Sequence, residues 1–189
     1  MKYVDGKYHT GRYFYIFEKA EKFDNSTGCC IVVTLKCEQR LCKELGAPKT
    51  VQITYKLSKY DLKFNVSWFE KDANRLTEAI YLHLYPQTNQ IMLKKLGGLI
   101  NPFDVVGMGA KKLHAVQSVQ FEKKGKTVNV YNFHSPLFLL GKGKILEFDD
   151  KYENPKKDGV SFVLYDNVWG TNFPLWYSEN ASFDFVISE

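Results

Sequence analysis

The sequence predicts an all-β protein, an antiparallel β-sandwich with a short, partly helical segment before it. Apolar and polar residues alternate over 51–57 and again over 62–68, and this period of two buries one face of a strand. Turn-forming residues recur at short intervals, without a long helical pattern between them. Aromatic residues make up 15% of the chain, which also favours strands.

The elements are expected in the following order. Residues 1–45 form an N-terminal segment, interpreted as the tail of a preceding domain, and residues 46–189 form the sandwich. Within the N-terminal segment, an apolar stretch at 13–17 has no clear period, and a short helix is expected at 36–45 because Gly46 suits a helix end. After the two alternating runs, further strands are expected at 79–85, 89–94, 114–121, 127–133, 136–140, 160–166 and 182–187.

The composition excludes several classes of protein. The net charge is +5, and the lysines are scattered, whereas a nucleic-acid-binding protein gathers its positive charge on one face. No apolar run is long enough to cross a membrane, and the N-terminus lacks the apolar centre of a signal peptide. Neither nucleic acid nor membrane is therefore an expected partner, and the chain is expected to be cytoplasmic if Met1 is its natural start.

The cysteines and histidines do not predict a metal site. Cys29, Cys30, Cys37 and Cys42 do not have the paired spacing of a zinc site, and the four histidines are dispersed along the chain. Free buried thiols are the preferred interpretation, with a disulfide between Cys37 and Cys42 as the alternative in an oxidising compartment. No metal and no cofactor are expected.

The most informative segment connects the strand ending at Trp68 to the strand beginning at Ala79. It contains no Gly or Pro, although such residues are usual in turns, and it is rich in charged and amide side chains. Loops held by a rigid sheet are where binding groups concentrate. The alternative is a surface loop with weak ion pairs, including one between Arg75 and Glu78.

Two later segments also contain groups that could bind a ligand. In the first segment, Asp104 lies in a connection at 96–106 and His114 opens the strand after it. The second segment, 165–177, combines amides with tryptophans. Amides can bind the hydroxyl rim of a sugar while an indole ring contacts its apolar face. Each has a structural alternative: a turn cap, a satisfied histidine at a strand start, backbone hydrogen bonds, or packing at a corner. The candidate substrate-binding residues are Lys71, Asp72, Asn74, Arg75, Glu78, Asp104, His114, Asn167, Trp169, Asn172 and Trp176.

These segments also carry a resemblance. The motifs at 71–78, 96–106 with 113–116, and 167–177 resemble, in the same order, the C-terminal region of uncharacterised proteins related to glycoside hydrolase family 38, the α-mannosidase group. The first motif departs from the family pattern at Thr77, where proline is usual. The resemblance implies a mutarotase-like sandwich of the supersandwich type. It also implies a partner, an N-terminal α/β catalytic domain that carries the metal ligands and the nucleophile and has no counterpart in this sequence.

Three functions follow as hypotheses. The first is a non-catalytic C-terminal sandwich that rims a carbohydrate site, with the isolated chain inactive. The second is a free-standing carbohydrate-binding module with Trp169 or Trp176 as its platform. The third is a small sugar-active enzyme that uses Glu78 with Asp104, Asp166 or His114. A glycosidase of that kind would need two carboxyl groups about 5–5.5 Å or about 6.5–9.5 Å apart.

Overall fold

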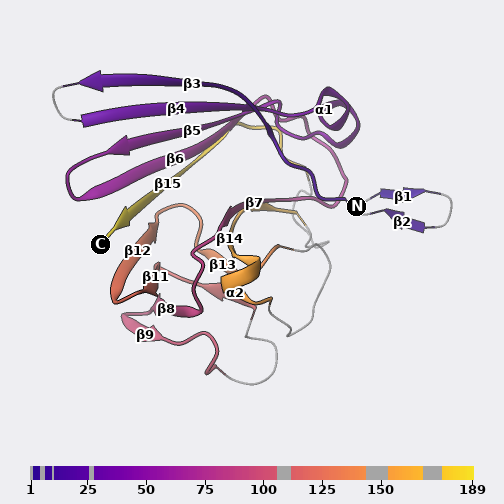
Figure 1. Cartoon of the computed structure of the whole chain (residues 1–189). Helices are drawn as coiled ribbons and strands as arrows, with labels where there is room; N and C mark the ends of the chain where they lie inside the picture. The colour runs from indigo at the N-terminus through magenta and orange to yellow at the C-terminus, as the bar shows by residue number, and fades with distance from the viewer. Residues whose placement is uncertain are drawn as a thin grey trace. The chain divides into compact units, whose positions relative to one another are not determined.

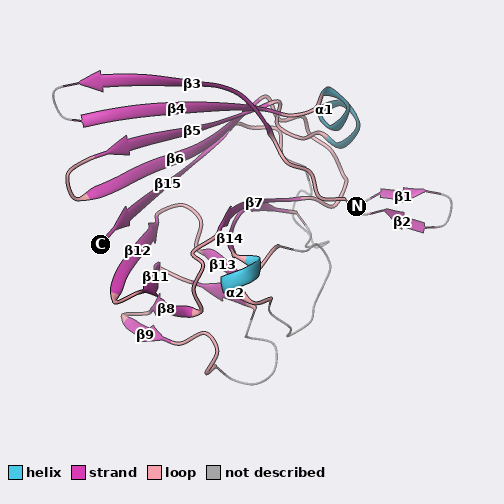
Figure 2. Ribbon diagram, in the orientation of Figure 1, coloured by secondary structure: helices cyan, strands magenta, loops and turns pink. Residues whose placement is uncertain are grey.

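A computed structural model describes residues 2–4, 7–9, 11–25, 28–105, 112–143, 153–167 and 176–189 of the chain. Antiparallel strands dominate these residues and the helices are short, which confirms the predicted all-β sandwich (Figure 2). The chain divides into two compact units. The first combines Met1–Glu78 with Asp166–Asp184, and the second combines Ala79–Tyr165 with Phe185–Glu189. No helix among the described residues is both long and apolar enough to span a bilayer.

The first unit is built on one antiparallel sheet in the strand order β3-β4-β5-β6-β15 (Figure 1). These strands are β3 (Ile16–Asn25), β4 (Gly28–Lys36), β5 (Thr50–Leu57), β6 (Asp61–Phe69) and the first half of β15 (Ala181–Ser188). The register places Ile31 opposite Tyr55, and Tyr55 opposite Phe64. A separate hairpin pairs β1 (Lys2–Val4) with β2 (Lys7–His9).

Helix α1 (Gln39–Leu45) connects β4 to β5 within the predicted range of 36–45. Gly46 ends it in the left-handed region at a φ of 66°, as expected for a glycine that follows a helix. The helix buries Leu41 and Cys42. All four cysteines are free thiols in the structure, as interpreted from the sequence, but only Cys42 is buried and the other three are half-buried.

Strands β3 and β4 are the main elements that the sequence pattern did not predict. A bulge between Phe17 and Lys19 interrupts the register of β3, and this breaks the period of two in its sequence. In β4 apolar residues occupy consecutive positions, so no alternation is visible. Because β4 pairs with β5 from Cys29 to Lys36, the N-terminal segment extends the sheet of the sandwich. The domain boundary expected at residue 45 stays a prediction.

The second unit contains two sheets. One has the strand order β10-β13-β14-β7, and in the other β12, β11, β8 and β9 follow the second half of β15. Phe162 of β14 contacts Phe138 of β13 and Phe185 of β15, each with ring centroids 5.3 Å apart, so aromatic side chains pack between the sheets. The elements are β7 (Ala79–Leu84), β8 (Gln90–Lys95), β9 (Gly98–Ile100), β10 (Leu113–Ala115), β11 (Ser118–Lys123), β12 (Lys126–Asn132), β13 (Leu137–Leu140), α2 (Pro155–Asp158) and β14 (Val160–Asp166).

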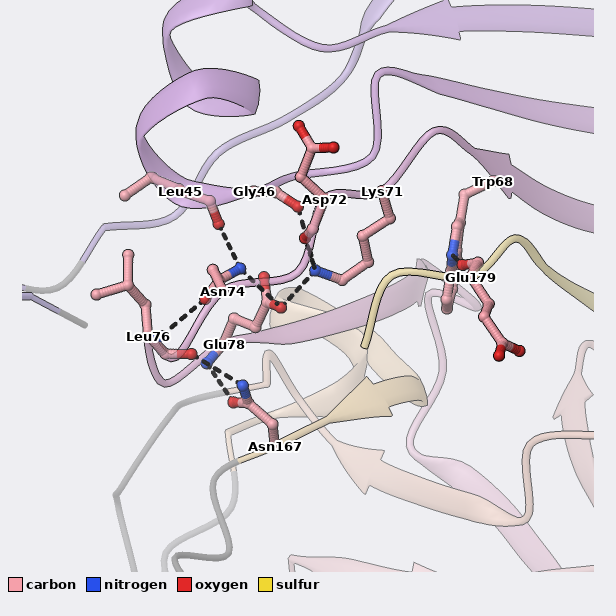
Figure 3. A network of polar contacts seen from close by, with 10 residues as sticks. All are labelled: Leu45, Gly46, Trp68, Lys71, Asp72, Asn74, Leu76, Glu78, Asn167 and Glu179. Carbon is pink, nitrogen blue, oxygen red and sulfur yellow. Dashed lines mark hydrogen bonds and ion pairs between the residues drawn. The ribbon is translucent and has the colours of Figure 1, made fainter. Parts of the chain in front are cut away.

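Trp68 anchors the core of the first unit at the end of β6. Only 1% of its surface is exposed, its ring packs against Phe183 at a centroid distance of 5.1 Å, and its Nε1 donates to the carbonyl of Glu179 at 3.1 Å (Figure 3). The indole is therefore buried with its polar atom satisfied. This fixes the end of β6, where the polar loop begins.

Candidate functional site

The loop between β6 and β7 is organised around a buried ammonium group. The Lys71 side chain is wholly buried, and its Nζ lies 2.5 Å from Oε1 of Glu78. The same Nζ donates to the carbonyl of Gly46 at 3.1 Å and to that of Asp72 at 3.4 Å (Figure 3). A buried charge is tolerated only when it is paired and hydrogen-bonded, and these three acceptors meet that condition. Lys71 therefore ties the loop to the end of α1.

Asn74 makes a second link between the same two segments. Its Nδ2 donates to the carbonyl of Leu45 at 2.8 Å and to Oε1 of Glu78 at 3.2 Å, and its Oδ1 accepts the backbone N–H of Leu76 at 2.7 Å. The Leu45 carbonyl belongs to the last turn of α1, where carbonyls lack partners within the helix. The amide thus completes the end of the helix while it shapes the loop.

Asn167, which follows β14, binds the loop from its other side. Its Nδ2 donates to the carbonyl of Leu76 at 2.8 Å, and its Oδ1 accepts the N–H of Glu78 at 2.6 Å. Its backbone N–H also donates to the carbonyl of Glu78 at 3.1 Å. These contacts match the structural alternative that the sequence offered for this residue, hydrogen bonds to turn backbone. A contact with a ligand hydroxyl stays a prediction.

Burial sets the electrostatics of this network. It raises the pKa of Glu78, while the Lys71 ammonium and the Asn74 amide act in the opposite direction without cancelling the effect. Burial also raises the pKa of Tyr15, and the Glu78 carboxylate adds to that shift. Tyr15 therefore lies in the same electrostatic neighbourhood. The sequence reasoning missed it because the stretch at 13–17 has no period that would mark a buried position.

Arg75 takes a different place from the one suggested by its spacing. Its guanidinium carbon lies 4.7 Å from the ring centroid of Trp176, whereas the carboxylate of Glu78 pairs with Lys71. The Arg75–Glu78 ion pair, which the sequence offered as the structural alternative, is thus replaced by a cation–π contact of Arg75 with Trp176. Arg75 is exposed and Trp176 is 47% exposed, so both groups remain open to solvent.

Among the described residues, the side chains of the remaining candidates are not part of this network, although the backbone carbonyl of Asp72 accepts a hydrogen bond from Lys71. Asp72 is exposed and lines a cavity of about 490 Å³ beside Cys37 and Cys42. Asp104, in the second unit, accepts a hydrogen bond from Nδ2 of Asn101 at 2.7 Å within a turn, as its structural alternative proposed.

The second unit also contains His114, which is 3% exposed in β10. Trp169 and Asn172 lie outside the described residues. Among the residues that the structure describes, no three His, Cys, Asp or Glu side chains cluster as a metal site would require.

Comparisons with known proteins leave the family open. No protein-family model and no curated protein matches the sequence. A solved structure of a candidate aldose 1-epimerase from Escherichia coli K12 is similar with a TM-score of 0.43 and 8% identity, over 90% of this chain and 68% of that one. Similarity at this level carries no argument about function. The all-β sandwich rests on the strands themselves, and the resemblance to family 38 stays a prediction.

Proposed function

We propose that this chain is a non-catalytic, carbohydrate-contacting β-sandwich of a protein related to glycoside hydrolase family 38. The observation that carries the proposal is the stacked pair of Arg75 and Trp176, both accessible to solvent. An indole ring offers a flat apolar surface for the C–H face of a sugar, and a guanidinium group offers several donors in a fixed plane for its hydroxyls. The motif resemblance adds mannose-type sugars as the first class to test.

The hydrogen bonds made by the residues on either side of Arg75 in the chain support a binding role. Arg75 lies between Asn74 and Leu76, which are both tied down by hydrogen bonds, and the loop is further fixed by the buried pair of Lys71 and Glu78. A binding group on a pre-ordered loop loses less conformational entropy when its ligand arrives. The loop thus presents Arg75 at a defined position.

The same network disfavours catalysis by this chain alone. The Glu78 carboxylate is held by Lys71 and Asn74, and only 18% of its side-chain surface is exposed. Asp104 is engaged in its own turn within the other unit. We therefore place the chemical step in an α/β catalytic domain that works together with this sandwich.

An apolar face on the sheet of the first unit supports such a partner domain. Ile31, Tyr55 and Phe64 lie in one row across β4, β5 and β6, and Leu57 lies on the same side two residues along β5. Phe64 is buried, but Ile31 is 37% exposed and Leu57 is 59% exposed. The charged Lys22 of the edge strand β3 lies opposite Ile31 and borders these apolar side chains, and an apolar patch with a polar rim is typical of an interaction surface.

A free-standing carbohydrate-binding module is the second candidate, and one observation favours it. The contact between Arg75 and Trp176 is complete within the first unit and needs no other domain to form. The two candidates differ in their dependence on a partner, because a module binds with full affinity by itself.

Isothermal titration of the purified chain with mannosides and a wider sugar panel tests both candidates. Weak saturable binding that is lost in Trp176→Ala and Arg75→Ala supports the proposed site. Arg40→Ala is the matched control, because Arg40 is an exposed arginine on α1 whose ion pairs are also exposed. Turnover of aryl-mannosides by the purified chain would contradict the non-catalytic assignment.

A further inference from the structure

The outer face of β8, β11 and β12 forms a second polar surface, in the unit that does not contain Arg75 and Trp176. The strands place Glu122 of β11 opposite both Gln90 of β8 and Thr127 of β12. In the next row of the same face, Gln120 lies opposite Met92. Neighbouring strands are about 4.8 Å apart, so these side chains form a compact grid with similar spacing.

This grid is the floor of a cavity of about 320 Å³. Asn101, which follows β9, also lines the cavity, and its own hydrogen bonds hold it in place: its Oδ1 accepts the N–H of Phe103 at 3.0 Å and its Nδ2 donates to Asp104 at 2.7 Å. A volume of this size is at the small end of the range for ligand sites, about 300–1,000 Å³. It suits one small ligand.

The polar groups on the floor have hydrogen-bonding capacity that the protein does not use. Within the described part of the chain, no side-chain hydrogen bond or ion pair is made by Gln90, Gln120, Glu122 or Thr127. Each amide offers a donor group and an acceptor, the hydroxyl offers both, and the carboxylate accepts only. This contrasts with the loop of the first unit, where Lys71, Asn74 and Glu78 satisfy one another.

The chemistry of the floor selects the class of ligand. Among the described side chains that line the cavity, Glu122 is the only charged one, which disfavours anions, and its carboxylate requires hydrogen-bond donors. The half-buried Met92 side chain supplies an apolar surface between the amides. Alternating donors and acceptors around an apolar spot complement a neutral ring with several hydroxyl groups.

We propose that the outer face of β8, β11 and β12 is a binding site for a single neutral sugar residue. Gln90, Gln120, Glu122 and Thr127 would contact its hydroxyls, and Met92 would contact its C–H face. This site is separate from the pair of Arg75 and Trp176 and does not depend on the function proposed for that pair.

The test uses the methionine methyl groups of the whole chain as probes. The sequence contains three methionines, so the methyl spectrum of a ¹³C-methyl-methionine sample has few signals, and Met92→Leu assigns the one from this face. D-mannose, D-glucose, D-galactose and myo-inositol are titrated separately into the millimolar range. We expect at least one of the hexoses to shift the Met92 signal in a saturable way.

Variants then locate the response. Gln120→Ala should weaken the affinity about tenfold, because it removes hydrogen bonds to the ligand. Gln117→Ala, which changes an exposed glutamine between β10 and β11, is the matched control and should leave the affinity measured at the Met92 signal unchanged. An unshifted Met92 signal with all four compounds overturns the inference, and so does a shift that Gln120→Ala leaves unaltered. Sugar binding that is lost in Trp176→Ala but kept in Gln120→Ala would support the first site and refute this one.

Discussion

Lys71→Met is the substitution that most directly tests the structural account of the loop. Methionine matches the lysine stem in length but cannot donate, so Glu78 loses its ion-pair partner and the carbonyls of Gly46 and Asp72 lose a donor. Removing one member of a buried pair typically costs about 3–5 kcal/mol. The Glu78 side chain keeps 18% of its surface exposed and its pKa is already raised, so it can be hydrated or protonated. We therefore expect the low end, a loss of about 3 kcal/mol in the free energy of unfolding.

Urea unfolding followed by circular dichroism at pH 7 measures this loss. The matched control is Lys49→Met, because Lys49 pairs with Glu70 at 2.9 Å but both side chains are more than half exposed. The urea midpoint of the Lys49→Met protein should stay at the wild-type value. The double variant Lys71→Met/Glu78→Leu should be more stable than Lys71→Met alone, since no unpaired carboxylate remains. A Lys71→Met protein with wild-type stability would refute the reasoning that the ion pair is buried and essential to the loop.

Three further predictions concern pH, backbone and thiol chemistry. Burial raises the pKa of Glu78 in the native state above its ordinary value of 4.5, so the native state binds this proton more tightly than the unfolded state does. The resulting contribution to stability is complete below pH 4.5 and is lost as pH rises through the native pKa. Glu78→Gln should therefore remove this part of the pH dependence of the unfolding free energy measured in urea titrations. Gly46→Ala should lower the free energy of unfolding by about 2–3 kcal/mol in the same assay, because an added Cβ would lie 2.5 Å from the side-chain amide nitrogen of Asn74. The control is Gly125→Ala, which is also at positive φ but has open space around it and should cost about 1 kcal/mol. Burial raises the pKa of the Cys37 thiol to about 12. At pH 8 iodoacetamide should therefore modify Cys37 at least about tenfold more slowly than it modifies free N-acetylcysteine. Peptide mass mapping measures the two rates, and equal rates would contradict the burial of Cys37.

The fold was predictable where one face of a strand is buried and the other is solvated. Alternation located β5 and β6 to within one residue at each end, because each strand has an apolar and a polar side. The same reasoning failed for β3, where a bulge shifts the register, and for β4, where apolar residues occupy both faces. Periodicity reports burial on one face and therefore cannot detect strands that lack this contrast.

The candidate site was predictable as a segment but not as a geometry. The concentration of polar groups after β6 pointed to the loop that contains the buried network, and its binding role stays a prediction. The pairing of Glu78 with Lys71 could not be read from the spacing, since loops have no fixed side-chain period. The acceptors that complete the network, the carbonyls of Leu45 and Gly46, lie 29 and 25 residues away from the side chains that they bind. Only the chain path brings these atoms together.

Isothermal titration of the whole chain with mannose oligosaccharides, compared between wild type, Trp176→Ala and Arg40→Ala, tests whether Arg75 and Trp176 form a carbohydrate contact. We expect equal saturable binding by wild type and by Arg40→Ala, and clearly weaker binding by Trp176→Ala with an unchanged circular dichroism spectrum. Equal binding by all three proteins, or no binding of any sugar by the folded wild-type chain, would contradict the assignment of Arg75 and Trp176 as a carbohydrate contact.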